Sequence, residues 1–127
     1  MATLAPSFSV TNNIARGEIH YACAGFWNMD TMVDFQRELI AAARPMFENG
    51  RQMRSLADLR GFAVQTKEIS EAIKIAVNAA VKLGTVRSAI VTDSMLTAMQ
   101  YKRLNAIHEI ELFEDMDEAL AWLRCDL

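Results

Sequence analysis

The stretch RSLADLRGFAVQTKEISEAIKIAVNAAVKLGTVRSAIV, residues 54–91, decides the fold that this chain is predicted to adopt. Residues 54–59 and 86–91 are predicted to form two strands. Between them, Thr66 is a suitable N-cap for a helix, and Gly84 stands where a left-handed C-terminal cap belongs. A strand, a helix and a second strand in this order predict two parallel strands joined by a right-handed crossover.

The helix between these strands carries the clearest amphipathic pattern in the chain. Its apolar residues recur at a spacing of three or four, which places them on one helical face. These residues are Ile69, Ala72, Ile73, Ala76, Val77, Ala80 and Val81. We expect this face to pack against the sheet. Ile75 points off the face, and with Phe26 and Trp27 it is a candidate for a partly exposed apolar patch.

The segments before this unit add two strands and one helix. Residues 7–11 alternate between polar and apolar side chains, and residues 18–26 are largely apolar on both faces. A short connection predicts that they form an antiparallel hairpin with a central second strand. Asn28 or Asp30 can cap the helix that follows. Pro45 is expected to kink this helix or to restart it as a short final turn.

The segments after the unit are predicted to add a helix, a short strand and a final helix. Residues 92–94 can cap a helix that extends to about residue 104. The residues expected to point inward from that helix are Leu96, Met99 and Leu104. Residues 110–113 form the strand, and Asp115 caps the last helix. The order β-β-α-β-α-β-α-β-α predicts a single α/β domain over residues 1–127. Its five-stranded sheet is expected to be mostly parallel, with an antiparallel N-terminal edge strand.

Composition excludes several classes of protein. The formal net charge is −3, with acidic and basic residues interspersed, so no basic surface for nucleic acid is expected. No segment approaches the roughly 20 apolar residues that a membrane span requires, and residues 1–10 do not resemble a signal peptide. The two cysteines form no CxxC motif. A cytoplasmic domain with reduced thiols is therefore expected.

Each residue that could carry catalysis has a structural explanation. Cys23 lies in an apolar strand and is expected to be a buried thiol. Ser94 lacks the GxSxG context of a hydrolase, and helix capping accounts for it. Alternation places Glu109 and Glu111 on one strand face and His108 off it, which does not suit a metal site. We therefore expect no catalytic residue, no metal and no cofactor, and the chain is not predicted to be an enzyme.

Three segments resemble the STAS domain, the sulfate transporter and anti-sigma factor antagonist fold. They are SLADLRGF at residues 55–62, SAIVTDS at residues 88–94 and LFEDMDEALAWLR at residues 112–124. The likeness covers nearly the whole chain and is strongest to a group of uncharacterised bacterial proteins with that fold. It implies a STAS-like fold and a bacterial switch protein that binds another protein.

The resemblance also implies a departure at the regulatory position. In antagonists of this family, a partner kinase that is also the anti-sigma factor phosphorylates a serine at the start of the helix after the third strand. A gapless alignment on residues 55–62 places Glu68 at that position. Thr66 is the nearby hydroxyl before the helix, and Ser70 lies inside it. The resemblance thus implies an antagonist-like module without the usual phosphoacceptor serine.

Polar residues gather where the predicted parallel strands end. Ligands of open α/β sheets bind beyond the carboxyl ends of the strands, and helix N-termini there can bind anions. The candidate residues at this edge are Trp27, Asn28, Arg60, Gln65, Thr66, Glu68, Thr92, Asp93 and Ser94. Glu114 and Asp115 are expected to lie beside them. Helix capping and turn formation are the simpler explanation for the same residues.

Three functions remain open from the sequence. The first is a non-enzymatic module that binds a protein partner, or a second copy of itself as a homodimer, through the helix after the third strand and the neighbouring loops. The second is a carrier or sensor of a small apolar or lipid-like ligand. It is suggested by eight methionines and by a loose likeness to CRAL-TRIO lipid-binding domains. The feature that discriminates this function is a closed cavity lined by Met32, Phe35, Ile73 and Met99, and a solid core at those positions would exclude it. The third is an enzyme with a minimal site around Arg60 and Asp93.

Overall fold

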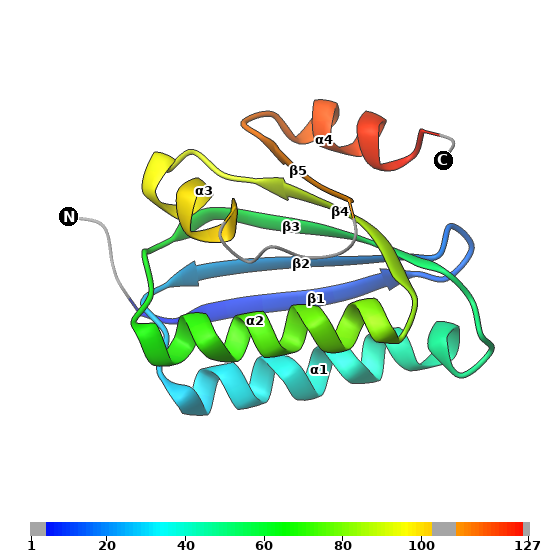
Figure 1. Cartoon of the computed structure of the whole chain (residues 1–127), viewed down its shortest axis with the longest axis horizontal. Coiled ribbons are helices and arrows are strands. Elements are labelled where there is room, and N and C mark those ends of the chain that lie inside the picture. Colours follow the sequence, from blue (N-terminus) through cyan, green and yellow to red (C-terminus); the bar gives the residue numbers. More distant parts are fainter. Residues whose placement is uncertain (1–4, 103–108, 126–127) are drawn as a thin grey trace.

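The computed structural model describes residues 5–102 and 109–125. The elements within these ranges follow the predicted order (Figure 1). They are β1 (Ser7–Asn13), β2 (Glu18–Gly25), α1 (Met29–Phe47), β3 (Met53–Phe62), α2 (Lys67–Lys82), β4 (Thr85–Val91), α3 (Met95–Lys102), β5 (Glu109–Phe113) and α4 (Met116–Leu123).

The five strands form one sheet in the order β1-β2-β3-β4-β5. Strand β1 pairs antiparallel with β2, and all other neighbouring pairs are parallel. This confirms the predicted mostly parallel sheet with an antiparallel N-terminal edge. Each parallel pair is joined through a helix, as parallel strands require.

Helices cover the two faces of the sheet unequally. Figure 1 shows α1 and α2 side by side along one face, and α4 over β3, β4 and β5 on the other. The first face contains the larger core, which includes Trp27, Phe35, Leu59 and Ile90. The second core gathers around Leu56 from the sheet and Ala119 and Leu123 from α4. Alternation along the strands sends side chains to both cores in turn.

Helix α1 begins as predicted but ends differently. The Asn28 side chain accepts a hydrogen bond of 2.8 Å from the Thr31 N–H, which makes Asn28 the N-cap. The helix then runs through Pro45 to Phe47, so the prediction of a restart at Pro45 is wrong. Pro45 lies two residues from the helix end, and the helix continues around it: Asn49 donates a side-chain hydrogen bond of 2.7 Å to the Pro45 carbonyl.

Helix α3 corrects a prediction about its buried face. Leu96 and Met99 were expected to point inward, but 65% and 46% of their surfaces are exposed. The third such residue, Leu104, lies outside the described residues. Thr97 is fully buried and donates a hydrogen bond of 3.1 Å to the Phe62 carbonyl, and Gln100 contacts α2. This eight-residue helix therefore docks through polar side chains and leaves its large apolar ones outside.

Candidate functional site

An apolar cavity of about 320 Å³ lies between the sheet and the helices α1 and α2. Its walls include Met32, Phe35 and Ile73, three of the four residues predicted to surround a ligand cavity. The fourth, Met99, is not among the lining residues, because α3 turns it outward at the end of the sheet. The cavity is open on one side rather than closed, and the core at Met32, Phe35 and Ile73 is not solid.

Small side chains on facing walls create this cavity. Ala76, Ala79 and Ala80 line it from α2, and Ser55 and Ser88 line it from the sheet. None of these side chains is long enough to fill the space between the layers. As a result, Ile69 is the one described residue of the α2 apolar face that is fully buried. The composition of that face, rich in alanine, therefore leaves a hollow where larger residues would form a solid core.

Exposed apolar residues mark the side on which the cavity opens. Ile40 of α1, Ile75 of α2 and Leu83, which follows α2, all line the cavity, and 46%, 67% and 44% of their surfaces are exposed. The prediction that Ile75 is exposed is confirmed. Phe26 is also exposed, at 42%, whereas the prediction for Trp27 is wrong because its ring is buried against Phe8, Phe35 and Phe62.

The polar groups of the cavity wall are mostly hydroxyls. The Ser55 and Ser88 hydroxyls lie 2.6 Å apart, on neighbouring strands in direct register. Burial raises the pKa of Tyr21, against a smaller opposing effect of its hydrogen bond with Ser55. Burial, with a smaller contribution from Asp58, raises the pKa of Cys23 to about 12, so Cys23 is a thiol at neutral pH. These groups can exchange hydrogen bonds but carry no charge.

At the carboxyl edge of the sheet, the side chains of six of the nine candidate residues hold the backbone in place. The Trp27 indole N–H donates a hydrogen bond of 2.9 Å to the Ala24 carbonyl. Gln65 is buried; its side chain accepts a hydrogen bond from the Trp27 N–H and donates to the Gly25 and Ala63 carbonyls. Asn28, Thr66 and Ser94 cap α1, α2 and α3. The Thr92 hydroxyl accepts from the Ser94 N–H.

The other three edge candidates, Arg60, Glu68 and Asp93, are exposed. Two hydrogen bonds of 2.9 and 2.8 Å join the Arg60 guanidinium to the Asp58 carboxylate. This pair raises the pKa of Arg60, with smaller contributions from Asp93 and Asp115, which places both carboxylates within its electrostatic reach. One arginine thus stands among three carboxylates, and this part of the edge is acidic.

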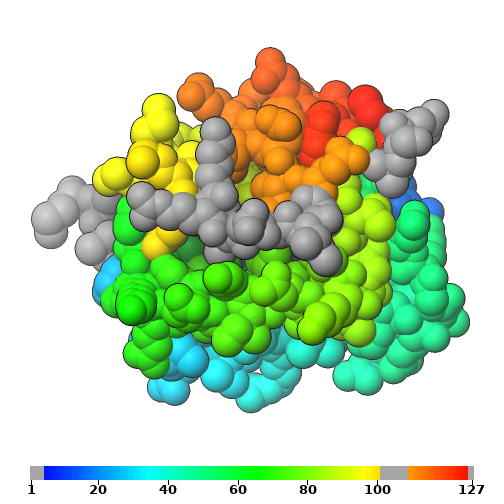
Figure 2. All heavy atoms as spheres, viewed as in Figure 1, coloured from blue at the N-terminus to red at the C-terminus, as the bar shows by residue number. Residues whose placement is uncertain are grey.

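Helix α3 presents an apolar surface next to this acidic edge. Met95, Leu96 and Met99 are 76%, 65% and 46% exposed, and Val64, which follows β3, is 43% exposed. Figure 2 shows α3, in yellow, at the surface of the molecule. We call these four residues the α3 surface. Exposed apolar residues that gather in this way are typical of sites that bind other molecules.

The model of the SpoIIAA-like family matches residues 27–124. The chain belongs to the SpoIIAA-like family. An uncharacterised DUF3478 protein with a SpoIIAA-like fold from Shewanella loihica has a similar structure, with a TM-score of 0.72 and 15% sequence identity, covering 97% of this chain and 98% of that one. An anti-sigma factor antagonist from Mycobacterium paratuberculosis is also similar, with a TM-score of 0.64 and 14% identity over 98% of each chain. No curated protein matches the sequence.

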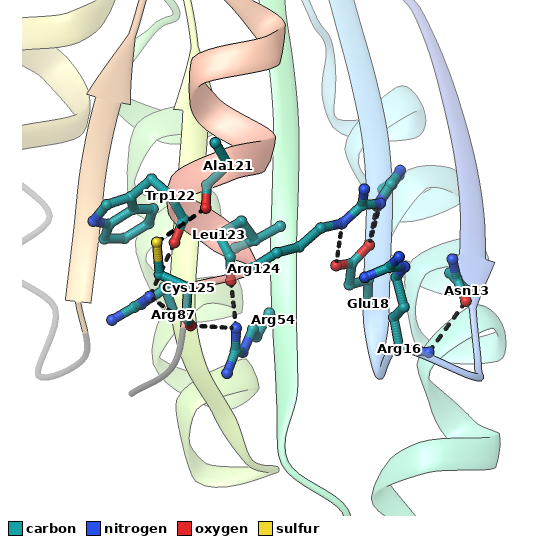
Figure 3. A network of polar contacts seen from close by, with 11 residues as sticks. Asn13, Arg16, Glu18, Arg54, Arg87, Ala121, Trp122, Leu123, Arg124 and Cys125 are labelled. Carbon is teal, nitrogen blue, oxygen red and sulfur yellow. Dashed lines mark hydrogen bonds and ion pairs between the residues drawn. The ribbon is translucent and has the colours of Figure 1, made fainter.

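This SpoIIAA-like chain also contains a polar network that sequence analysis missed (Figure 3). Glu18, only 1% exposed, accepts hydrogen bonds of 2.9 and 3.1 Å from Arg124 and one of 2.9 Å from His20. Burial alone would raise the pKa of Glu18, but these partners together hold it below its usual value. Figure 3 shows Arg124 reaching from the end of α4 to Glu18 on β2. The two residues are 106 positions apart, so no local pattern predicts the pair.

Two further arginines of this network hold the C-terminal end of α4. Arg54 donates to the carbonyls of Leu123 and Cys125 at 2.5 and 2.9 Å, and Arg87 donates to the Trp122 carbonyl at 3.0 Å. The Arg87 guanidinium also lies 4.6 Å from the centre of the Trp122 ring. Cations stabilise the negative end of a helix dipole, so these contacts dock α4 on the sheet. The network is best explained as structural.

Neither a metal-binding cluster nor a membrane-spanning helix is found in the part of the chain that the structure describes. No three His, Cys, Asp or Glu side chains gather there to hold a metal ion. His108, one of the residues weighed for metal binding, lies outside this part, and Glu109 forms an ion pair of 3.1 Å with Arg87. Over the same residues, no helix combines the length and the apolar character needed to cross a membrane.

Proposed function

We propose that this chain is a cytoplasmic, non-enzymatic regulatory module that binds a protein partner through the α3 surface and the adjacent N-terminal end of α2. Membership of the SpoIIAA-like family supports a regulatory or protein-interaction role in general. The observation that carries the proposal is the exposure of Met95, Leu96 and Met99 on a helix that docks through Thr97. Outward-facing apolar residues of this kind gain stability when a partner covers them.

The charges beside the α3 surface specify the chemistry of the partner. Asp58 pairs with Arg60, and the Asp93 and Asp115 carboxylates lie within its electrostatic reach, so this group of four charged residues is net negative. A partner that offers apolar side chains flanked by basic residues is complementary to this arrangement. Association with such a partner is expected to weaken as salt concentration rises, because exposed charges are screened.

The proposal does not require phosphorylation at the start of α2. Glu68, the residue aligned with the family phosphoacceptor, is exposed in the first turn of the helix. It supplies a fixed negative charge where the helix dipole favours one. The Thr66 hydroxyl accepts a hydrogen bond of 3.2 Å from the Ile69 N–H and caps the helix without modification. We therefore propose that binding is constitutive rather than switched by a phosphoserine.

A double substitution, Leu96→Ser with Met99→Ser, tests this function. Protein complexes are isolated from the native host and their masses and affinities measured by native mass spectrometry and titration. We expect the substitution to weaken the recovered complex at least about tenfold, since several exposed apolar contacts are lost. Val33→Ser on α1, where 44% of the surface is exposed, is the matched control. An equal effect of both changes, or a complex insensitive to salt, would refute the proposed surface. A homodimer lost with the same double substitution would identify a second copy as the partner.

We also propose a second function, as a carrier or sensor of a small apolar ligand, because of the cavity under α1 and α2. Its volume of 320 Å³ lies at the lower end of the range of about 300–1,000 Å³ typical of small-molecule sites. Native mass spectrometry of protein purified from its host should reveal an adduct that disappears on denaturation. Ala76→Leu, which fills part of the cavity, should reduce that adduct, while Ala121→Leu on the exposed face of α4 should not. Absence of any adduct from both wild type and control would argue against this function.

A further inference from the structure

The cavity wall contains a pair of serine hydroxyls flanked by isoleucines on the neighbouring strands. In register across the sheet, Ile19 pairs with Ser55, Ser55 with Ser88, and Ser88 with Ile110. The two serine hydroxyls lie 2.6 Å apart, and both residues line the cavity together with Tyr21. A large apolar pocket with a few convergent polar groups is the usual form of a site that orients a small ligand.

Charge is missing from the cavity side of this wall. Arg54 is the one ionisable basic residue among the described lining residues, and no acidic residue is among them. The Arg54 guanidinium is held by the Leu123 and Cys125 carbonyls at the end of α4, on the opposite face of the sheet. An ionised group placed beside the serines would therefore lose its water without gaining a counter-ion, which is costly.

We infer that the cavity binds an uncharged amphiphile, a single alkyl chain with a hydroxyl or comparable neutral head, with the head at Ser55 and Ser88. This inference rests on the second proposed function and specifies its ligand. The two hydroxyls bond to each other, and Ser55 also bonds to Tyr21, but each serine oxygen has two acceptor positions, so the pair can accept a hydrogen bond from a neutral head. The alkyl chain would lie among the apolar residues that connect the serines to the opening beside Ile40 and Ile75. An ionised head would instead have to remain in water at that opening.

Calorimetric titration with 1-decanol and with decanoate tests this orientation, because the two probes share a tail length and differ in the charge of the head. We expect 1-decanol to bind at least about tenfold more tightly than decanoate, since the anion has no partner in the cavity. The double substitution Ser55→Ala with Ser88→Ala should weaken 1-decanol binding about tenfold, as expected for the loss of one or two hydrogen bonds. Because both hydroxyls are removed together, neither serine hydroxyl remains in place without its serine partner.

The matched control is Ser7→Ala with Ser9→Ala, which removes two exposed hydroxyls from β1. This change should leave both affinities unaltered, and circular dichroism should confirm that both double variants remain folded. Equal binding of the two probes, tighter binding of decanoate, or an unchanged affinity after removal of Ser55 and Ser88 would overturn the inference while the carrier function stands. Failure of both probes to bind would overturn the carrier function and the inference with it.

Discussion

Glu18 is a buried carboxylate whose stability depends on a residue at the far end of the chain. Only 2% of its side chain is exposed, whereas 34% of the Arg124 side chain is. Removing one partner of a buried pair costs about 3–5 kcal/mol, and partial exposure of Arg124 reduces this value. We therefore expect Glu18→Gln to lower the free energy of unfolding by about 1–3 kcal/mol. Urea denaturation measures this change, with Glu38→Gln on the exposed face of α1 as the control. Equal effects of the two substitutions would contradict the importance of the pair.

The Glu18 carboxylate also makes the stability of the fold depend on pH in the acidic range. The pKa of Glu18 is lower in the folded protein than in the unfolded chain, so the charged form stabilises the fold. This contribution is complete above the unfolded pKa and is lost as the pH falls through the folded pKa. Wild-type stability should decline from about pH 5 downward more steeply than that of Glu18→Gln. Thermal denaturation from pH 7 to pH 3 tests this difference, and parallel curves would exclude Glu18 as its source.

The two cysteines are expected to differ in reactivity. Burial raises the pKa of Cys23 to about 12, while Cys125 is exposed at the end of α4. Thiolates react and thiols do not, so a disulfide reagent at pH 8 should label one thiol quickly. Cys125→Ser should abolish that rapid phase and leave Cys23 to react only when the protein unfolds. Rapid labelling of the Cys125→Ser variant would show that the cavity opens far enough to expose Cys23.

At the scale of the elements, α3 and α4 attach to the sheet in opposite ways. Helix α3 docks through Thr97 and Gln100 and exposes its apolar residues. Helix α4 buries Ala119 and Leu123, and arginines from β3 and β4 hold its C-terminal carbonyls. The apolar contacts of α4 therefore give it a firmer attachment than the polar contacts give α3.

Arg87 is expected to secure α4. It donates hydrogen bonds to the carbonyls of Trp122 and Cys125 and lies over the Trp122 ring. Arg87→Ala should destabilise the protein by about 1–3 kcal/mol, because these contacts and a buried ion-pair partner are lost. Hydrogen exchange in residues 116–123 should accelerate more than exchange in α1. The control is Arg37→Ala, whose side chain is 73% exposed. Acceleration spread evenly over the whole domain would contradict a local role for Arg87.

At the scale of the whole molecule, two alanines that look alike in the sequence have different surroundings, because one of them lines the cavity. Ala76 on α2 lines the cavity, whereas Ala57 on β3 is 1% exposed and packed in the core. Ala76→Leu should raise the free energy of unfolding by about 1 kcal/mol, because new methyl groups enter empty space. Ala57→Leu should lower it by about 1–3 kcal/mol through overpacking. Urea denaturation of both variants provides the comparison. A loss of stability in Ala76→Leu would show that the space is already filled.

Much of the edge of the sheet could be predicted because caps and turns are local. Asn28, Thr66 and Asp115 accept hydrogen bonds from backbone N–H groups three residues ahead, and short-range spacing reveals such positions. The carboxylates close to Arg60 were harder to predict from the sequence. Its neighbours Asp93 and Asp115 come from other strand ends, and their proximity depends on how the parallel strands align.

The sequence by itself determined the order of the elements, the parallel sheet and most helix starts, because periodicity and capping act over a few residues. Tertiary structure decided which helical faces are covered. The apolar spacing of α3 predicted burial, but the helix lies at the end of the sheet and turns Leu96 outward. The alanine-rich face of α2 predicted a packed core, but small side chains meet Ser55 and Ser88 across a hollow. The cavity and the pairing of Glu18 with Arg124 exist only where distant segments meet, and their distances are set by the packing of the whole domain.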